Sequence, residues 1–458
     1  MRPAAGFVLA VFALTTTATA AETARYTIEQ AISVARSNNP DIAIAQKKVE
    51  AARAGLVEAR AGYLPSVVSR GRWARRERQG ETNLRPEDYN VNIRIVESLY
   101  SGGATSSQSA IAQLKLKKAE ADLEAVVARV TMEVRLAFNE LLLNRERIDV
   151  HEQSVDVLQQ ELKSQRERFS AGTVGELNVR RAEVSLANEQ PELIQAQTDL
   201  RNSFLQLSAL LGAPPRASGE PAFDISGQLV YEPRRPNLTD CLAHAKAMRP
   251  ELRSADADIA IEQEQLRLDR SATKPKFDIF SGYEVYNERD PTLGREFNHG
   301  YIVGVNGSWA LFDGFATRGR VQATKARREA AIRTREALRL TIDAEVRSAF
   351  LDLEQADRVL EAETKNVQTA EESLEIARGN LATGLGTQLD VLQATSDVTR
   401  TRTTRLSATY LHNAALARLD RACGGETSSL GEATPTAPSA VDQVLSLTRP
   451  PSSLGKRR

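Results

Sequence analysis

The sequence has no net charge, few aromatic residues and, beyond its N-terminus, no long hydrophobic run. Its 60 basic residues balance 60 acidic ones, which argues against nucleic acid as a partner, because phosphate binding needs an excess of positive charge. Aromatic residues make up 5% of the chain, a profile more typical of long helices than of a compact enzyme. After residue 20, no apolar stretch approaches the length of about 18 residues that a membrane-spanning helix needs.

Residues that carry catalysis or metal binding do not occur in the spacings that such chemistry needs. The 4 histidines are scattered singly, and no metal-ligand spacing is present. There is no nucleophile–base pair and no phosphate-binding loop. The sequence therefore predicts no enzyme, no metal site and no cofactor.

The N-terminus has the pattern of a secretory signal peptide. Arg2 is followed by an apolar run over residues 4–14 and by Ala18-Thr19-Ala20, a small-residue cleavage site, so residues 1–20 are expected to be removed. A transmembrane anchor is the alternative, but the run is too short to span a bilayer. No cysteine lies at the cleavage point, so the chain has no visible site for a bacterial N-terminal lipid.

The rest of the chain repeats itself at an offset of about 210 residues. The segment EVRLAF at residues 133–138 returns as EVRSAF at residues 345–350, an offset of 212. The segment LYSG at residues 99–102 returns as LFDG at residues 311–314 with the same offset. A constant offset over such a distance indicates duplication of one large structural unit rather than a small solenoid repeat.

Each half predicts a pair of strands with one apolar and one polar face. Val91, Ile93 and Ile95 alternate with polar residues, and residues 300–310 repeat this alternation less cleanly. Such strands suit an outer-membrane barrel, whereas a soluble sheet with one wet face is the alternative. Four strands cannot close a barrel, and lipid excludes an open edge, so a barrel requires several chains; three chains give twelve strands. Aromatic residues near the strand ends favour the barrel: Trp73, Tyr100, Tyr283, Tyr286, Tyr301 and Trp309.

After each pair of strands the sequence predicts a helix of unusual length. Between Gly103 and Phe169 there is no proline and no glycine, and apolar residues recur at steps of three and four. An ordinary coiled coil is the alternative for any single stripe of this kind. Each long helix ends in a glycine-rich turn, and a returning helix follows. Two shorter helices together match the long one in length, so they can stack beside it and form an even cylinder.

These patterns divide the chain into a signal peptide (1–20), a first repeat (21–211), a proline- and glycine-containing connector in an equatorial region (212–237), a second repeat (238–423) and a tail (424–458) expected to be disordered. Within the repeats, strands are expected at about 65–79, 88–98, 275–287 and 300–310, helical hairpins at 103–211 and 315–423, and hairpin tips at 170–176 and 382–388.

From about residue 25 to 423, the arrangement resembles the TolC family of outer-membrane efflux and type I secretion channels. The paired halves, the LYSGG and LFDG segments after the second strands, the glycine turns and TQLDVLQA at residues 387–394 carry this resemblance. It implies a homotrimer whose twelve-stranded β-barrel lies in outer-membrane lipid and continues as an α-helical barrel in the periplasm. It also implies partners: a periplasmic adaptor (membrane fusion protein) and an inner-membrane RND or ABC transporter.

The function expected from this resemblance is a passive export duct that conducts substrates from the adaptor and transporter to the outside. A structural, envelope-spanning coiled-coil scaffold without channel activity is the alternative, and it leaves the alternating strands and glycine tips unexplained. A periplasmic adaptor is a third possibility, but adaptors usually carry one helical hairpin, and this chain has two.

The second tip is expected to form the pore constriction. Asp390 matches the tip aspartate of the family, so three copies would form an acidic ring that favours cations. The alternative is that Asp390 only caps the returning helix. The second acidic position of the family is Gln393 here, and Asn178 is assigned to the constriction from the other tip. Leu381 and Gly386 replace the Tyr and Arg that latch the closed state in the family, which predicts a weaker latch.

Two further sets of residues are predicted. The turns at the tips suit contact with an adaptor, although glycine there can also serve turn geometry alone. Cys241 and Cys423 lie at helix ends that meet in the stacked-helix arrangement, so a disulfide between them is expected in an oxidising compartment, with two unpaired thiols as the alternative. The docking residues are Gly172, Thr173, Val174, Gly175, Gly384, Leu385, Gly386 and Thr387.

Overall fold

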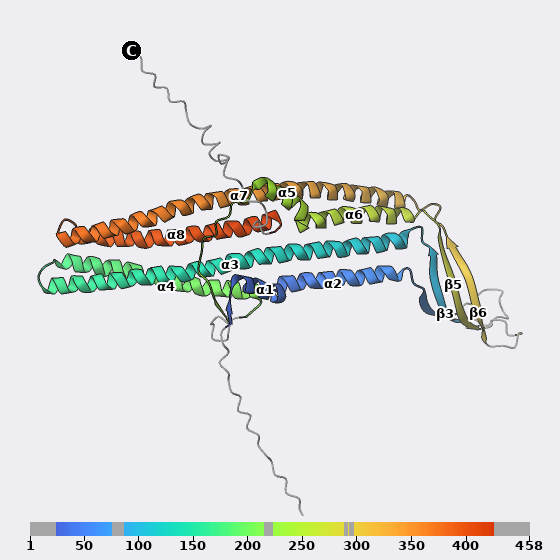
Figure 1. The fold of residues 1–458 in the computed structure, drawn as a ribbon. Helices are drawn as coiled ribbons and strands as arrows, with labels where there is room; N and C mark the ends of the chain where they lie inside the picture. The colour runs from blue at the N-terminus through green and yellow to red at the C-terminus, as the bar shows by residue number, and fades with distance from the viewer. Residues whose placement is uncertain (1–23, 76–86, 215–222, 288–291, 293–296, 426–458) are drawn as a thin grey trace, which may run out of the picture.

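The structure is a computed structural model that describes residues 24–75, 87–214, 223–287, 292 and 297–425. The expected signal peptide and residues 426–458 of the expected tail lie outside the described residues, as does part of the first expected strand, beyond Arg75. The described part is an elongated body in which long helices run side by side and a small sheet stands at one end (Figure 1).

The same order of elements occurs in both halves of the chain. Each half has two short helices, two strands, one very long helix and a returning helix. The first half contains α1 (Ile28–Asn38), α2 (Pro40–Ala61), β2 (Ser66–Arg75), β3 (Glu87–Tyr100), α3 (Ala104–Ser170) and α4 (Glu176–Leu211). The second contains α5 (Leu238–Met248), α6 (Pro250–Ser271), β5 (Lys276–Asn287), β6 (Phe297–Ser308), α7 (Ala316–Thr383) and α8 (Gln388–Cys423).

Two very short strands, which the sequence analysis did not anticipate, join the halves. β1 (Ala24–Tyr26) pairs in parallel with β4 (Phe223–Ile225), which lies within the connector. Phe223 and Ile225 are buried in the core of the first half, so this pairing holds the connector against the helices.

Helix ends follow local signals in the sequence. Thr27 and Gln30 form a capping box at the start of α1, and the Asn39 side chain caps α2, whose first residue is a proline. The long helices have 67 and 68 residues, so each is about 100 Å long. Gly172 and Gly384 follow them in the left-handed conformation, with φ of 75° and 78°, and the chain reverses there.

The helices form a single curved layer with two free edges. α3 packs against α6 and α8 on one side and against α2 and α4 on the other, and α7 packs against α6 and α8 (Figure 1). The order across the layer is therefore α7, then α6 stacked end to end with α8, then α3, then α2 stacked with α4. In the described chain, α7 forms one edge of this layer and α2 with α4 forms the other.

The sheet has the same edges as the helical layer. Its four antiparallel strands have the order β2-β3-β5-β6, so β2 and β6 are the outer strands. β2 follows α2, and β6 precedes α7. Each edge of the sheet therefore continues into the corresponding edge of the helical layer.

The core is concentrated midway along the helices. One cluster joins α1, α3 and α4 around Val134 and Leu141, and a second joins α5, α7 and α8 around Val346 and Leu419. Val134 and Val346 are related by the 212-residue offset, so the two halves use the same position for their cores. No helix among the described residues is both long and apolar enough to cross a membrane.

Candidate functional site

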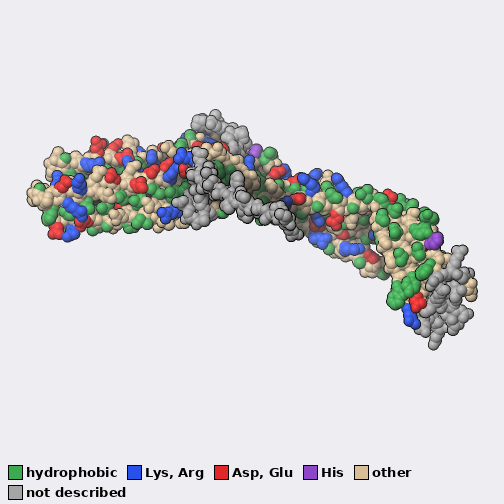
Figure 2. Space-filling view, turned by 90° about the horizontal axis from the view of Figure 1, so that it is seen from below, with side chains coloured by type: hydrophobic (Ala, Val, Ile, Leu, Met, Phe, Trp, Pro, Cys, Tyr) green, Lys and Arg blue, Asp and Glu red, His purple; other side chains and the backbone are tan. Residues whose placement is uncertain are grey.

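One face of the sheet is apolar and exposed. Val91, Ile93 and Ile95 lie on it, and strand pairing places Val285 and Tyr283 directly beside the first two. Figure 2 shows hydrophobic side chains gathered toward the end that carries the sheet, whereas charged side chains are spread along the helices. The exposed apolar residues of this face are Val67, Trp73, Tyr89, Val91, Ile93, Ile95, Phe277, Ile279, Tyr283, Val285, Phe297, Tyr301, Val303 and Val305.

The opposite face of the sheet is polar and carries an ion pair. Arg94 on β3 lies 3.3 Å from the Glu284 carboxylate on β5, and its guanidinium stands 5.4 Å from the centre of the Phe280 ring. Gly304 on β6 makes room for that ring, because a Cβ there would lie 2.7 Å from it. Asn92 is buried beside these groups. The sheet thus has one polar face and one apolar, exposed face.

At the second tip, Thr387 is the N-cap of α8, and Asp390 is its partner in a capping box. The Asp390 carboxylate accepts hydrogen bonds from the backbone N–H and the hydroxyl of Thr387, each 2.7 Å long. These bonds hold the pKa of Asp390 below its usual range. The capping role is therefore present in the structure, and Asp390 is at the same time exposed at the end of the molecule.

The other predicted constriction residues occupy different positions near the tips. Gln393 is exposed on α8 and lines a groove of about 610 Å³ together with Leu177 and Leu389. Asn178 is half-buried in the first turn of α4, where its backbone N–H donates to the Gly175 carbonyl. Gln393 follows Asp390 by three residues, so the two share one side of α8.

The predicted docking turns are exposed to different degrees. Leu385 is 84% exposed, whereas Val174 is half-buried. Gly172 and Gly384 have the positive φ that their turns require. The backbone of these turns therefore requires glycine at positions 172 and 384. Leu385 presents an exposed apolar side chain.

A buried polar contact between the two hairpins was missed by the sequence analysis. The Gln165 amide on α3 donates to Gln388 Oε1 on α8 at 2.9 Å and to Glu161 Oε1 at 2.8 Å. The Gln388 amide also bonds Glu161. Gln165 is 1% exposed and Gln388 5%. A glutamine at a packing position of a long helix was the available signal, but its partner lies 223 residues away.

The structure brings Cys241 and Cys423 together. Both are fully buried in the core of the second half, and their thiols are in hydrogen-bond contact. That contact lowers the pKa of Cys241 and raises the pKa of Cys423, with burial adding to the rise. Both are free thiols in the structure, so the disulfide stays a prediction.

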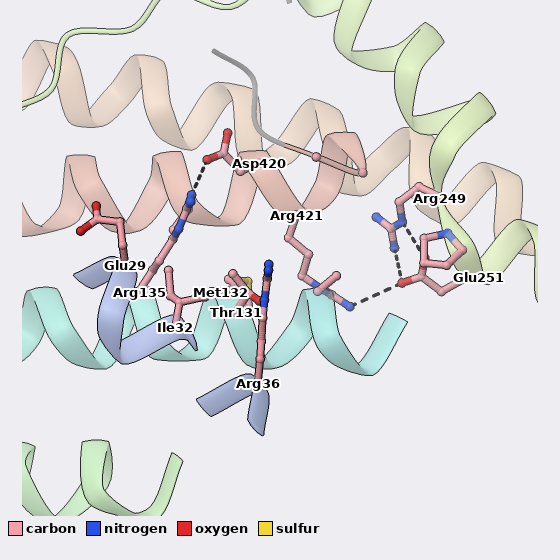
Figure 3. Close-up of a pocket in the computed structure, with 15 residues that line it drawn as sticks. Glu29, Ile32, Arg36, Thr131, Met132, Arg135, Arg249, Glu251, Asp420 and Arg421 are labelled. Atoms are coloured by element: carbon pink, nitrogen blue, oxygen red, sulfur yellow. Dashed lines mark hydrogen bonds and ion pairs between the residues drawn. The ribbon is translucent and has the colours of Figure 1, made fainter. Parts of the chain in front are cut away.

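A charged pocket at the middle of the molecule joins the two halves (Figure 3). It has a volume of about 510 Å³ and is lined by α1 and α3 of the first half and by α6 and α8 of the second. Arg135 on α3 lies 2.9 Å from Asp420 on α8, and buried Arg249 contacts Glu251 at 3.0 Å. Its arginines are largely engaged by these carboxylates, so the pocket is a junction of ion pairs.

Among the described residues, no group of three or more histidine, cysteine, aspartate or glutamate side chains could hold a metal ion. His412 illustrates why single histidines do not form such a site. It is fully buried, its Nε2 is hydrogen-bonded to the Glu232 carbonyl at 2.9 Å, and its Nδ1 lies 2.8 Å from the Asp357 carboxylate, so it joins α7, α8 and the connector.

Comparison with known proteins assigns these features to a family. The family model for outer membrane efflux proteins matches residues 31–213 and 241–425. CyaE of Bordetella pertussis is 26% identical over 414 residues, which is 88% of this chain and 84% of CyaE. Nodulation protein T of Rhizobium leguminosarum is 24% identical over 383 residues, covering 80% of this chain and 78% of the relative.

A solved structure has the same fold. The crystal structure of the Campylobacter jejuni CmeC outer membrane channel matches with a TM-score of 0.73 at 16% identity, covering 93% of this chain and 95% of that chain. The two segments of the family match correspond to the two halves of the present fold. The chain therefore belongs to the outer membrane efflux protein family, the TolC-like channels that lie in the outer membrane and extend into the periplasm.

Proposed function

We propose that three copies of this chain form an outer-membrane export duct. It has a β-barrel at one end and the tips of the helical hairpins at the other. The apolar outward face of the sheet carries this proposal. Fourteen large apolar side chains are exposed there, an arrangement that water disfavours and lipid favours. The polar face with Arg94 and Glu284 then lines the inside of the barrel.

The open edges of the sheet support assembly from several copies. β2 and β6 have no outer partner in the described chain, and lipid does not tolerate unpaired backbone groups. Pairing of β6 in one copy with β2 in the next satisfies both edges and closes a ring. Three copies would supply twelve strands, enough for a barrel with an open interior.

The helical part supports a tunnel through the periplasm. Helices about 100 Å long continue directly from the sheet, and their layer has the same two free edges. A duct of this kind is passive, so its energy comes from an inner-membrane RND or ABC transporter, joined to it by a periplasmic adaptor. Its cargo is then set by the transporter.

The tips support a role in docking and in the constriction. The turns at 170–176 and 382–388 are the parts of the helical barrel farthest from the sheet (Figure 1), where an adaptor would meet it. Asp390 of three copies would form an acidic ring that favours cations, with Gln393 on the same side of α8 and Asn178 on the neighbouring tip. Gln393 in place of a second acid leaves one acidic ring.

Photo-crosslinking in the native cell tests this proposal. A photoreactive residue at Val174 or Leu385 is expected to capture a periplasmic adaptor, identified by mass spectrometry. Leu340, an exposed residue in the first half of α7, is the matched control and is expected to capture no adaptor. The genetic neighbour of the captured adaptor would then identify the transporter class.

The opposite outcome favours the scaffold. If the tips capture only other envelope proteins and the chain fractionates without heat-modifiable trimers in the outer membrane, the duct is wrong. No observed feature favours the scaffold at present, because a scaffold would not need an apolar sheet face.

A further inference from the structure

The start of α7 contains a strained aromatic residue. Among the described residues, Phe315 is the only non-glycine residue with a positive φ, 66°. A side chain clashes with the backbone in this conformation, so glycine is the residue expected there. The position equivalent to Phe315 in the first half is Gly103, with φ of 91°. The second half therefore places phenylalanine where the first half has the favoured residue.

The strain places an aromatic pair on the surface. Phe315 is 65% exposed and Phe312 is 74% exposed, and their rings meet edge to face at 5.4 Å. Both lie between β6 and α7, on the free edge of the chain. A strained backbone and two exposed rings at a free edge of the described chain indicate a partner outside it.

The internal seam between the two halves shows how such a junction packs. Here β3 pairs with β5 and α3 packs on α6, so the β3–α3 junction meets the α6–β5 junction. A Cβ on Gly102 would lie 2.9 Å from Lys274 and from the Ser271 carbonyl, and Tyr100 packs near Phe277 at 6.5 Å. The two junctions are therefore in close contact.

The repeat predicts the same contact between copies. The β6–α7 junction repeats the β3–α3 junction, and the α2–β2 junction repeats the α6–β5 junction, as Pro65 and Pro275 show. Antiparallel pairing of β6 with β2 of the next copy, which rests on the proposed ring, places Ser308 beside Arg70, because the equivalent residues Val96 and Phe280 are paired in the internal seam. The segment 309–315 then lies against residues 61–69 of the neighbouring copy.

The residues at the two seams differ in a matched way. Thr273 and Lys274 of the internal seam correspond to Tyr63 and Leu64, which are 53% and 67% exposed in the single chain. Inside the chain, Gly102 packs against Lys274 and Tyr100 lies near Phe277. At the free edges, the equivalent positions are Gly314 and Leu64 for the first pair, and Phe312 and Val67 for the second. We propose that Phe312, whose ring meets Phe315 edge to face, packs against Leu64 and Val67 of the neighbouring copy and forms an apolar seam at the base of the barrel.

A pair of equivalent positions tests this contact. Benzoylphenylalanine in place of Phe312 is expected to give covalent dimers and trimers on irradiation, crosslinked at residues 62–67 of another copy. The same photoreactive residue at Tyr100, the repeat equivalent, is expected to crosslink only within its own chain. Heat-modifiable migration of the unirradiated protein shows whether trimers form. This measurement tests the proposed ring independently of the crosslink.

Substitution of Phe315 adds a test that needs no crosslinker. Phe315→Gly removes the backbone strain, so folding of the chain is expected to be unimpaired. Trimer dissociation in detergent is nevertheless expected to be on the order of tenfold faster, because Phe312 loses the ring that supports it in each seam. Phe169→Ala, which removes an exposed aromatic near the opposite end, is the control and is expected to leave the rate unchanged.

The outcomes separate this proposal from the proposed function. Intact trimers that give no crosslink between copies from position 312 and dissociate normally with Phe315→Gly would place the aromatic pair against lipid and overturn the seam alone. Absence of trimers in the native protein would overturn both.

Discussion

At the residue scale, single side chains in this protein often serve two purposes, and Asp390 is an example. The structure shows it capping α8 through Thr387, while its exposed place at the tip suits the proposed acidic ring. A cap needs only an acceptor oxygen, whereas an acidic ring needs the negative charge. The two roles can therefore be separated by a substitution that keeps the oxygen and removes the charge.

Asp390→Asn is expected to keep the capped tip and to reduce cation selectivity, because the amide oxygen of asparagine can still accept the hydrogen bonds from Thr387. Asp390→Ala should lose both. Reversal potentials of single channels in a salt gradient measure the selectivity, and an unchanged potential in Asp390→Asn would remove Asp390 from the pore.

The pKa of Asp390 is lower in the folded protein than in the unfolded chain. Its contribution to the stability of the folded tip is therefore complete above the ordinary aspartate range and is lost as pH falls through the lowered pKa.

The cysteine pair gives a second residue-scale prediction. Cys241 and Cys423 are in contact, and the periplasm is oxidising, so exchange with a disulfide-bearing oxidant of that compartment should join them. The denatured, unreduced protein is expected to show no free thiol, and the reduced protein two. Cys423→Ser should leave one thiol in both states. Two free thiols before reduction would end the prediction.

At the element scale, the two hairpins of one chain are held together by apolar packing and by a few buried polar bonds. The long helices were predictable because their apolar residues recur at helical spacing without an interrupting proline. The contact of Gln165 with Gln388 was not, because a helical pattern shows which side is buried but not which helix covers it. This contact lies beside the tips, at the end of the helices that is farthest from the sheet.

Gln165→Ala is expected to loosen the hairpins near the tips, because it leaves Gln388 without one buried partner, at a cost of about 1–3 kcal/mol. Faster amide exchange over residues 161–170 and 388–395 is the expected observation. Gln160→Ala, which removes an exposed bond to Asp156, should change little. Equal exchange in the two variants would show that the buried network does not hold the hairpins.

At the scale of the whole molecule, the structure is a layer with two matching free edges. β6 and α7 form one edge, and β2 with α2 and α4 forms the other. The internal contact between β3–α3 and α6–β5 is the contact that we propose is repeated between copies. Membership of the outer membrane efflux protein family agrees with this arrangement, since its members are outer-membrane channels.

The sequence alone determined the duplication, the long helices, the strand faces and the glycine turns, because each depends on neighbours a few positions apart or on direct comparison of the halves. It also identified the family. The tertiary structure alone decided which helices lie side by side, that β1 and β4 pair, that Gln165 meets Gln388, and that Phe315 is strained. These features depend on contacts between residues far apart in the chain and on the φ angle of one residue. The periodicity of side chains along the sequence predicts neither of them.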